Sequence, residues 1–266
     1  MSNLIVRKGS RGPGGNVLTI TPQSAGWKYV GFEVYQLKQG ETLQRDTDGR
    51  EACIVLLGGK AHVKTAHASF SEIGRRMSVF EGTPACSVYV PAGDRFVVEA
   101  VTDLEFACCW APAQGILEAR LVSPEQVGVE KRGNGEMERT VHNILPESQP
   151  AESLLVVEVF TPPGHWSSYP PHKHDVMNLP QESLLEETYY HKVDPAHGFC
   201  LQRVYTDDRS LDEVLVVRDG DAVLVPRGYH PVSAPPGYAV YYLNVMAGPV
   251  RTWKFRNDPD HEWLFT

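Results

Sequence analysis

The sequence predicts an all-β protein built from two barrel-like domains in tandem. Short apolar or alternating segments recur at intervals of roughly ten residues, with Gly and Pro between them, as in sandwiches and barrels. The chain has 266 residues, which fits two domains of just over about a hundred residues each. Similar strand and turn signals follow one another in both halves, which indicates a weak internal repeat.

The first half contains clear strand signals. Residues 31–37 alternate apolar with polar side chains, as a half-buried strand does. Residues 51–57 form a more continuous apolar run that ends at Gly58-Gly59, which is typical of a buried strand followed by a turn. Further strands are expected over residues 61–63, 68–70, 87–90, 96–100 and 104–110.

The composition changes between Pro112 and Ser148, and residues 146–152 have the character of an interdomain linker. We therefore expect one domain over residues 1–145 and a second over residues 146–266. Residues 175–185 lack period-two alternation and are interpreted as an insertion, in which residues 183–187 could begin a helix. Strands of the second domain are expected over residues 154–160, 187–192, 198–205, 212–217, 222–225 and 239–246.

Composition excludes several classes of function. The formal net charge of -8 disfavours nonspecific binding of nucleic acid. No run of about 20 apolar residues could span a membrane, and residues 1–15 lack the apolar segment of a secretory signal. The five cysteines are an odd number without paired spacing, which argues for reduced thiols and a cytoplasmic location.

The strongest chemical signal is a pair of histidines, His172 and His174, separated by Lys173. On an extended strand, alternate residues face the same side, so the two imidazoles converge and Lys173 points away, where we expect it to be solvated. Glu187 and His230 are two further candidate ligands downstream. Three imidazoles and one carboxylate suit one divalent transition metal such as zinc, manganese, iron or nickel.

The alternative interpretation is that each of these residues is an ordinary surface or core side chain, which is more credible for any one of them than for the whole set. The identity of the carboxylate ligand also stays open. Glu186 precedes Glu187 on the same expected strand, and only one of the two can face inward. Alternation from Glu187 places Tyr189 and His191 on its own face.

The internal repeat resembles the two motifs of the cupin family, a small β-barrel of jelly-roll type. In the first half, Glu51 precedes Gly58 at the family spacing, and a strand runs into Pro91-Ala92-Gly93. In the second half the corresponding features are Glu187 and Pro226-Arg227-Gly228. The resemblance implies a bicupin in which the first barrel is degenerate, without metal ligands, and the second barrel binds the metal.

A narrower resemblance covers essentially the whole chain. Its motifs are similar to those of the 5-deoxy-glucuronate isomerase family of inositol catabolism, which is itself similar to the uronate isomerases of pectin breakdown. The motifs are Tyr169-Pro170-Pro171-His172-Lys173-His174-Asp175, Leu185-Glu186-Glu187-Thr188-Tyr189-Tyr190, Pro226-Arg227-Gly228-Tyr229-His230-Pro231, Arg139-Thr140-Val141-His142-Asn143-Ile144 and Asn244-Val245-Met246-Ala247-Gly248.

The resemblance implies an aldose–ketose isomerase that converts 5-deoxy-D-glucuronate, a small uronate-type substrate, to 5-dehydro-2-deoxy-D-gluconate. A homo-oligomer is also expected. A different metal-dependent cupin enzyme, such as a dioxygenase, and a non-enzymatic sugar-binding bicupin are the alternatives, because one fold hosts many functions.

Isomerisation moves a hydrogen between C1 and C2, by proton transfer or by hydride shift, and a metal bound to both substrate oxygens would stabilise the charge that develops on them. Tyr189 could orient the substrate or shuttle a proton, and His191 could act as acid or base; both could equally be residues that fill the barrel. Arg203, expected in a second inward row, and Arg227 are candidates to bind the substrate carboxylate, since guanidinium is bidentate. A surface salt bridge is the alternative for both.

Overall fold

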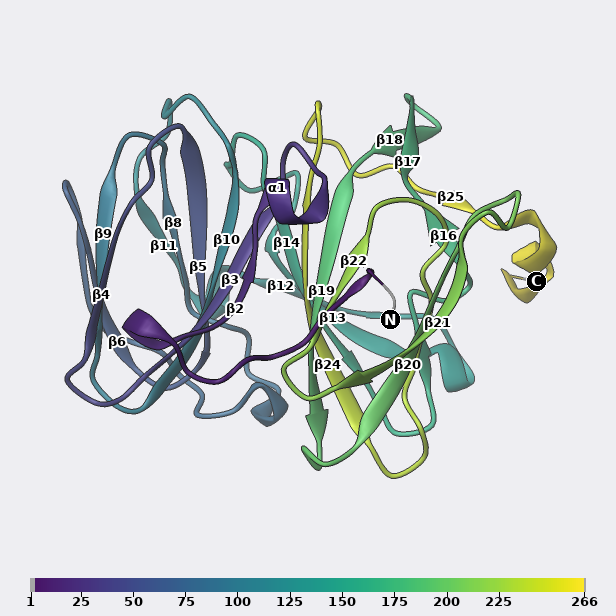
Figure 1. The fold of residues 1–266 in the computed structure, drawn as a ribbon, viewed down its shortest axis with the longest axis horizontal. Helices are drawn as coiled ribbons and strands as arrows, with labels where there is room; N and C mark the ends of the chain where they lie inside the picture. The colour runs from purple at the N-terminus through teal and green to yellow at the C-terminus, as the bar shows by residue number, and fades with distance from the viewer. Residues whose placement is uncertain (1–2, 266) are drawn as a thin grey trace. The chain divides into compact units, whose positions relative to one another are not determined.

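The computed structural model describes residues 3–265, which form strands connected by turns and very short helices (Figure 1). The chain forms two compact units. Residues 9–128 and 143–156 make the unit called N-terminal here, and residues 3–8, 129–142 and 157–265 make the C-terminal unit. In the described part of the chain, no helix has the length and apolar character needed to cross a membrane.

The helical segments are short. They are α1 (Pro22–Ala25) and the 3-10 turns η1 (Pro13–Gly15), η2 (Val79–Glu81), η3 (Pro124–Gln126), η4 (Gly135–Met137) and η5 (Pro259–Phe265). The all-β prediction is therefore confirmed. The predicted ranges 1–145 and 146–266 differ from the two units, because residues 3–8 and 129–142 belong to the C-terminal unit and residues 143–156 to the N-terminal one.

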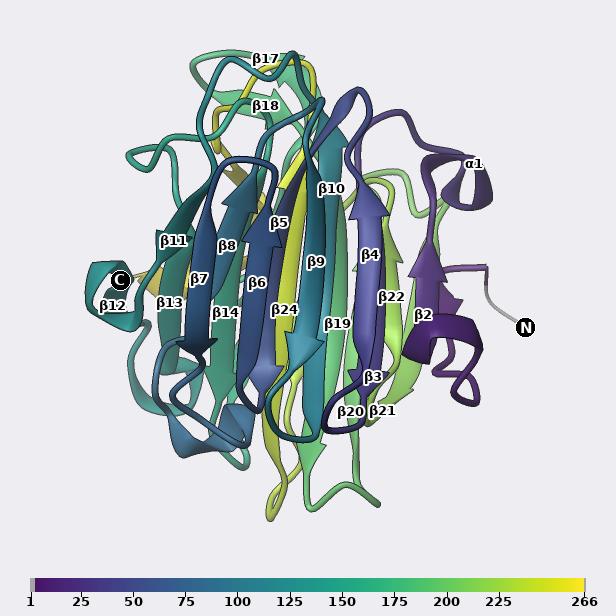
Figure 2. The same ribbon diagram turned by 90° about the vertical axis from the view of Figure 1, so that its left-hand side faces the viewer.

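The N-terminal unit contains a six-stranded sheet and a four-stranded sheet, and Figure 2 shows the second in front. The six strands, in spatial order, are β11 (Arg120–Val122), β8 (Ser87–Val90), β5 (Arg50–Gly58), β10 (Leu104–Pro112), β3 (Gly31–Leu37) and β2 (Asn16–Ile20). The four are β4 (Thr42–Asp46), β9 (Arg95–Ala100), β6 (Ala61–Thr65) and β7 (Ser69–Ile73).

One apolar core lies between these two sheets. Strand β5 lies between β8 and β10, and every residue from Glu51 to Leu57 is buried, which accounts for its continuous apolar run. Alternate residues of β5 enter the core, together with aromatic side chains that include Tyr35, Phe96 and Phe106. This barrel interior is therefore filled by side chains.

Glu51 is buried at the start of β5, and hydrogen bonds hold its carboxylate in place. Its carboxylate accepts hydrogen bonds from the backbone N–H groups of Glu152, Ser153 and Leu154 at 2.8, 2.7 and 2.6 Å. The hydroxyl of Tyr89 donates a fourth bond at 2.6 Å. Three amides and one phenol satisfy a buried carboxylate without a metal, so the segment predicted as a linker ends in a fixed anchor.

The C-terminal unit is built around part of a seven-stranded sheet. Its strands are β1 (Ile5–Val6), β22 (Ala222–Val225), β19 (Glu186–Asp194), β24 (Ala239–Ala247), β14 (Leu155–Thr161), β13 (Arg139–Leu145) and β12 (Gly128–Arg132), of which the last three pass from one unit into the other. A four-stranded sheet contains β15 (Trp166–Ser167), β23 (Val232–Ser233), β20 (Phe199–Tyr205) and β21 (Asp212–Arg218).

Two small strand pairs complete this unit. They are β16 (His172–Lys173) with β25 (Arg256–Asn257), and β17 (Asp175–Asn178) with β18 (Glu182–Leu184). The core of the unit contains residues of both larger sheets, among them Val157, Tyr189 and Val204.

The segment interpreted as an insertion, residues 175–185, contains two strands, and the expectation that a helix begins over residues 183–187 is wrong. The two strands form the hairpin β17–β18, and residues 183–187 contain the end of β18 and the start of β19, which are separated by Leu185. A side chain organises this hairpin: Glu182 accepts hydrogen bonds from the N–H groups of Asp175 and Val176 at 2.9 and 3.2 Å. Ser183 also donates its N–H to the carbonyl of Lys254 at 2.9 Å. Because side-chain and backbone hydrogen bonds hold this hairpin, rather than one buried apolar face, its sequence shows no period-two apolar pattern.

Candidate metal centre

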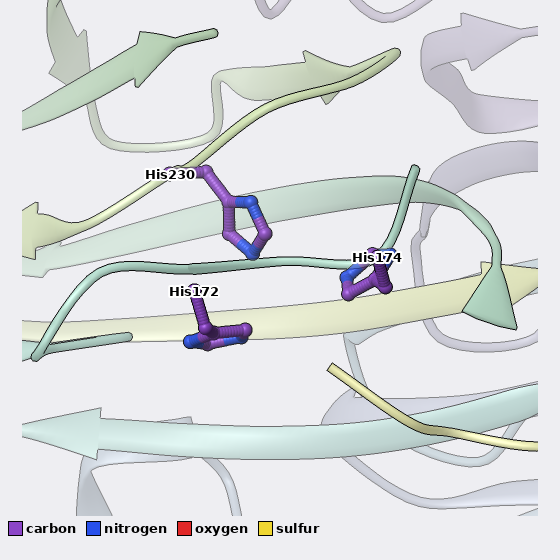
Figure 3. Close-up of side chains that lie close together, drawn as sticks. All are labelled: His172, His174 and His230. Atoms are coloured by element: carbon purple, nitrogen blue, oxygen red, sulfur yellow. The ribbon is translucent and has the colours of Figure 1, made fainter. Parts of the chain in front are cut away.

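Three histidines converge inside the C-terminal unit (Figure 3). His172 lies on β16, His174 follows it, and His230 follows the turn at Gly228. All three are buried, and one ring nitrogen of each lies within 4.8 Å of the others. The ring of His230 is 4.8 Å from that of His172 and 5.2 Å from that of His174, measured between centroids. Side chains from two separate segments are thus brought to one point.

Backbone geometry and one carboxylate hold the two segments together. Gly228 has a φ of 87°, and a Cβ there would lie 2.3 Å from the carbonyl oxygen of Tyr205, so a side chain cannot be accommodated. The N–H of Gly228 donates to Oδ2 of Asp175 at 2.7 Å. This bond links the turn before His230 to the segment that carries His172 and His174.

Glu187 supplies the carboxylate of the cluster. Its Oε2 lies 2.9 Å from Nε2 of His174 and 3.1 Å from Nε2 of His230. Nδ2 of Asn244, on the adjacent strand β24, donates to Oε1 of Glu187. Glu187 is buried at 1% exposure, whereas its half-buried neighbour Glu186 belongs to the opposite face of β19. The geometry therefore favours Glu187 as the carboxylate that could bind a metal.

Hydrogen bonds at the far side of each ring select the tautomer. Nδ1 of His230 lies 2.9 Å from the carbonyl oxygen of Gly228, and Nδ1 of His174 lies 3.3 Å from that of Leu185. Because a carbonyl only accepts, each Nδ1 carries the proton and each Nε2 turns a lone pair to Glu187 in the neutral imidazole. Nε2 of His230 is buried and makes no hydrogen bond. A cation can bind between these facing acceptors, the histidine Nε2 atoms and the Glu187 carboxylate.

The electrostatics of the cluster agree with that donor set. Burial, reinforced by His230 and His174, lowers the pKa of His172 well below its ordinary value. Burial likewise lowers the pKa of His230, whereas in His174 the Glu187 carboxylate outweighs burial and raises the pKa. Burial opposes ionisation of Glu187, but His230 and His174 outweigh it and lower its pKa to about 2. Neutral His172 and His230 beside an ionised carboxylate are suitable ligands for a divalent cation, and His174 would release its Nε2 proton when the cation binds.

A small cavity of about 30 Å³ adjoins the cluster. That volume holds on the order of two water molecules. Its walls include His172, Glu187 and Tyr189, and two guanidinium side chains, Arg132 and Arg139. Tyr189 forms a hydrogen bond of 2.9 Å with the hydroxyl of Ser168, and burial followed by Glu187 raises the pKa of Tyr189 far above its usual range. Tyr189 is therefore a protonated phenol beside the candidate metal centre.

His191 faces the same side of β19 as Glu187 and Tyr189, as alternation predicts, but it does not line this cavity. The side chain is completely buried. Its Nε2 lies 3.0 Å from Oε1 of Gln202, and its ring stacks against Tyr189 at 6.1 Å between centroids. Burial lowers the pKa of His191 to about 4. The expected role as acid or base stays a prediction.

Neither of the arginines chosen from the sequence lines the cavity. Arg203 forms two hydrogen bonds of 2.8 Å to Asp212. Strand β20 turns Cys200 and Val204 to the core, so the expected inward orientation of Arg203 is wrong. Arg227 is exposed in the turn before Gly228. Their roles in substrate binding remain untested, and the structure offers Arg139 and Arg132 at the cavity instead.

Lys173 points away from the histidine cluster, but the expectation that it is solvated is wrong. It is 5% exposed, and its ammonium group lies 2.8 Å from Asp175, 3.5 Å from Glu182 and 3.4 Å from Asp207. Three carboxylates offset the cost of burying this charge. Asp175 thus pairs with Lys173 and also accepts the bond from Gly228.

Sequence reasoning did not assign roles to Asn244, Arg139 or Ser168. Asn244 and Arg139 lie within the motifs that carry the family resemblance. Those motifs were the one sequence feature that could have pointed to them as functional residues. Neither an amide nor a guanidinium side chain shows its partner from local spacing, because each contacts residues far along the chain. Asn244 contacts a residue 57 positions away and Arg139 one 30 positions away.

The fold defines a bicupin, and its buried histidine cluster is a site that could hold a metal ion. Solved structures support the fold: an oxalate decarboxylase of Bacillus subtilis, described for its Mn(II) centres, matches 97% of this chain and 80% of its own with a TM-score of 0.67 at 13% identity. The chain belongs to the KduI/IolB family, whose family model matches residues 4–264. The resemblance to 5-deoxy-glucuronate isomerases is thereby confirmed.

Similar proteins match over nearly the whole length. A relative from Geobacillus thermodenitrificans, called 5-deoxy-glucuronate isomerase, is 66% identical over 264 residues, which are 99% of this chain and 96% of the relative. The protein of that name from Bacillus subtilis strain 168 is 52% identical over 246 residues, covering 92% and 91%. The crystal structure of an IolB-like protein from Salmonella typhimurium LT2 covers all of both chains, with 55% identity and a TM-score of 0.97.

Replacing His174 with Ala should remove most of the bound metal, because one of four ligands and the partner of Glu187 are lost. Elemental analysis of the purified variant should fall from about one divalent ion per chain, the occupancy of a single site, to near zero. The exposed His67→Ala is the matched control and should retain the ion. Native metal content in the His174 variant, with a folded spectrum, would contradict the ligand assignment.

His191 should make stability depend on pH. Its pKa is about 4 in the folded chain against an ordinary 6.5, so between these values the unfolded chain binds more protons and stability falls as pH falls. The shift corresponds to about 3 kcal/mol lost over that window. In His191→Gln the free energy of unfolding, measured with urea at pH 7 and pH 4, should therefore change less than in the native protein. An equal pH dependence in both would refute this assignment.

Proposed function

We propose that this protein is the aldose–ketose isomerase that converts 5-deoxy-D-glucuronate to 5-dehydro-2-deoxy-D-gluconate in inositol catabolism. The observation that carries the proposal is the buried set of His172, His174, His230 and Glu187 in a chain that is 66% identical to a named 5-deoxy-glucuronate isomerase. A cytoplasmic location and a homo-oligomeric state stay predictions.

We propose these four side chains as the ligands of one divalent transition metal. Four protein ligands leave two positions of an octahedral ion open, which favours manganese, iron or nickel over a closed tetrahedral zinc site. When bound, the ion would polarise the substrate carbonyl and stabilise negative charge on its oxygens. Asn244 would hold Glu187 in its ligating orientation through the bond to Oε1.

Tyr189 is the candidate for the proton-carrying group. Its hydroxyl lies at the cavity, and the elevated pKa keeps it protonated at neutral pH, so it can donate to a substrate oxygen. Ser168 holds that hydroxyl in place at 2.9 Å. His191 packs against the same ring and would orient it from the far side. A cavity of about 30 Å³ is too small for a six-carbon sugar, so its walls must move apart when substrate binds.

Arg139 is the candidate for binding the substrate carboxylate. It lines the cavity and donates from Nη1 to the carbonyls of Met137 and Tyr169 at 3.1 and 2.9 Å. Among the described residues it has no carboxylate partner at ion-pair distance, whereas Arg132 pairs with Glu130 at 2.5 Å. Arg139 therefore has guanidinium N–H groups that an anionic substrate can use.

The direct test is to incubate the metal-loaded protein with 5-deoxy-D-glucuronate and to follow formation of the ketose by NMR. We expect turnover that stops when the metal is removed and returns when it is restored. No turnover with a verified metal load would reject the isomerase. Oxygen consumption coupled to substrate loss would favour the dioxygenase alternative, and binding without conversion would favour the sugar-binding protein.

Arg139→Met should lower kcat/KM by roughly 100-fold, since a hydrogen bond to a charged group contributes about 1.5–3 kcal/mol. The loss should lie mainly in KM, and Arg139→Lys should recover part of it. Arg203→Met is the matched control, because it removes a guanidinium that already pairs with Asp212. Full activity in the Arg139 variant together with a large loss in the Arg203 variant would reverse the assignment.

A further inference from the structure

A second cavity lies wholly within the N-terminal unit and has about 570 Å³, far more than the cavity beside the histidine cluster. It is bounded by α1 and by the ends of several strands. Figure 2 shows the carboxyl ends of β2, β4 and β10, with α1, at the same end of the unit. A volume of this size is typical of small-molecule sites. None of the residues proposed to act in isomerisation lines it.

The cavity has a fixed polar wall. Glu33 lies on the same face of β3 as Tyr35 and Leu37, which belong to the apolar core. Its Oε1 accepts a bond of 2.6 Å from Arg45, and its Oε2 accepts one of 3.0 Å from the indole N–H of Trp110. The Glu33 side chain is 12% exposed and Trp110 is 8% exposed.

Folding alone does not account for this polar group. Withdrawing a carboxylate from water costs free energy. The Glu33 side chain is 12% exposed while its partner Arg45 keeps 42% exposure, and the neighbouring interior of the barrel is filled with apolar side chains. A few fixed polar groups at the edge of an apolar interior are instead characteristic of a binding site.

A second guanidinium lies beside the indole. Arg50 donates from Nη2 to the carbonyl of Tyr29 at 2.8 Å. A Cβ at Gly31 would lie 3.0 Å from that Nη2 and 3.3 Å from Cβ of Trp110, so the glycine leaves room for the guanidinium in this place. Arg50 and Trp110 both line the cavity.

The charge of the lining limits the class of ligand. Three carboxylates, Glu33, Asp46 and Asp48, face two guanidinium groups, Arg45 and Arg50, which leaves one excess negative charge. An anion would therefore gain little. A carboxylate accepts from hydroxyl groups and a guanidinium donates to them, so a neighbouring pair of the two suits vicinal hydroxyls.

We propose that this cavity of the N-terminal unit binds a neutral polyhydroxylated molecule, a sugar or a cyclitol. The site is separate in its residues from the candidate metal centre, and the proposal does not depend on the isomerase activity. It gives the N-terminal barrel a binding role of its own. The Glu33 and Arg45 side chains would hold adjacent hydroxyls, Trp110 would keep the Glu33 carboxylate in place through its indole N–H, and Asp48 would accept from a further hydroxyl at the rim.

The test uses the full-length, metal-loaded protein and isothermal titration with D-glucose and with myo-inositol up to about 50 mM. We expect saturable binding of at least one of them, weakened about tenfold in Glu33→Gln, equivalent to one lost hydrogen bond to a charged group. Glu41→Gln is the matched control, because it removes a carboxylate that pairs with Arg11 on the surface of the same unit. This control should bind as the native protein does.

Asp48→Asn covers the case in which the Glu33 variant does not fold. The residue is exposed and has a φ of 46°, which Asn tolerates, so this variant should fold and bind more weakly. The proposal is overturned if neither probe binds, or if binding is unchanged in both cavity variants. D-glucuronate, the anionic counterpart of D-glucose, is titrated in the same way. The proposal is also overturned if Glu33→Gln removes tighter binding of D-glucuronate than of D-glucose, because the site would then prefer an anion.

Discussion

The arrangement of the C-terminal unit depends on one electrostatic constraint. Oε2 of Glu187 lies within 3.1 Å of Nε2 atoms of two histidines, in a place where none of the side chains is exposed by more than a few per cent. Carbonyl oxygens hold the opposite nitrogens of both rings, so neutral imidazoles direct lone pairs at the carboxylate. Such a group of acceptors is unfavourable in a buried site unless a positive charge lies among them.

The surrounding structure fixes the atoms that create this constraint. Pairing of β19 with β24 places Asn244 where it can hold Glu187, and Asp175 joins the two histidine-bearing segments. Lys173, buried among three carboxylates, secures Asp175 in turn. These polar contacts position the side chains of the histidine cluster.

Much of this could be predicted from the sequence, and the exceptions have physical causes. Period-two alternation located the strands and placed His172, His174 and Glu187 on inward faces, because that signal is local. It could not show that Arg203 is paired with Asp212, since the pairing depends on the register of a neighbouring strand. Burial of Lys173 also depends on Asp207, which only the tertiary structure brings near, and the hairpin at residues 175–184 is held by a Glu182 side chain whose backbone partners leave no repeating apolar signal.

The glutamates at matching positions of the two repeats have diverged in what surrounds them. Glu187 faces imidazoles, whereas Glu51 is held by three consecutive backbone amides and the phenol of Tyr89. An engineer who grafted histidines into the first barrel would therefore not obtain a working coordination sphere. The backbone amides of residues 152–154 would first have to release the Glu51 carboxylate, so such a graft would require rebuilding a loop and not merely exchanging side chains.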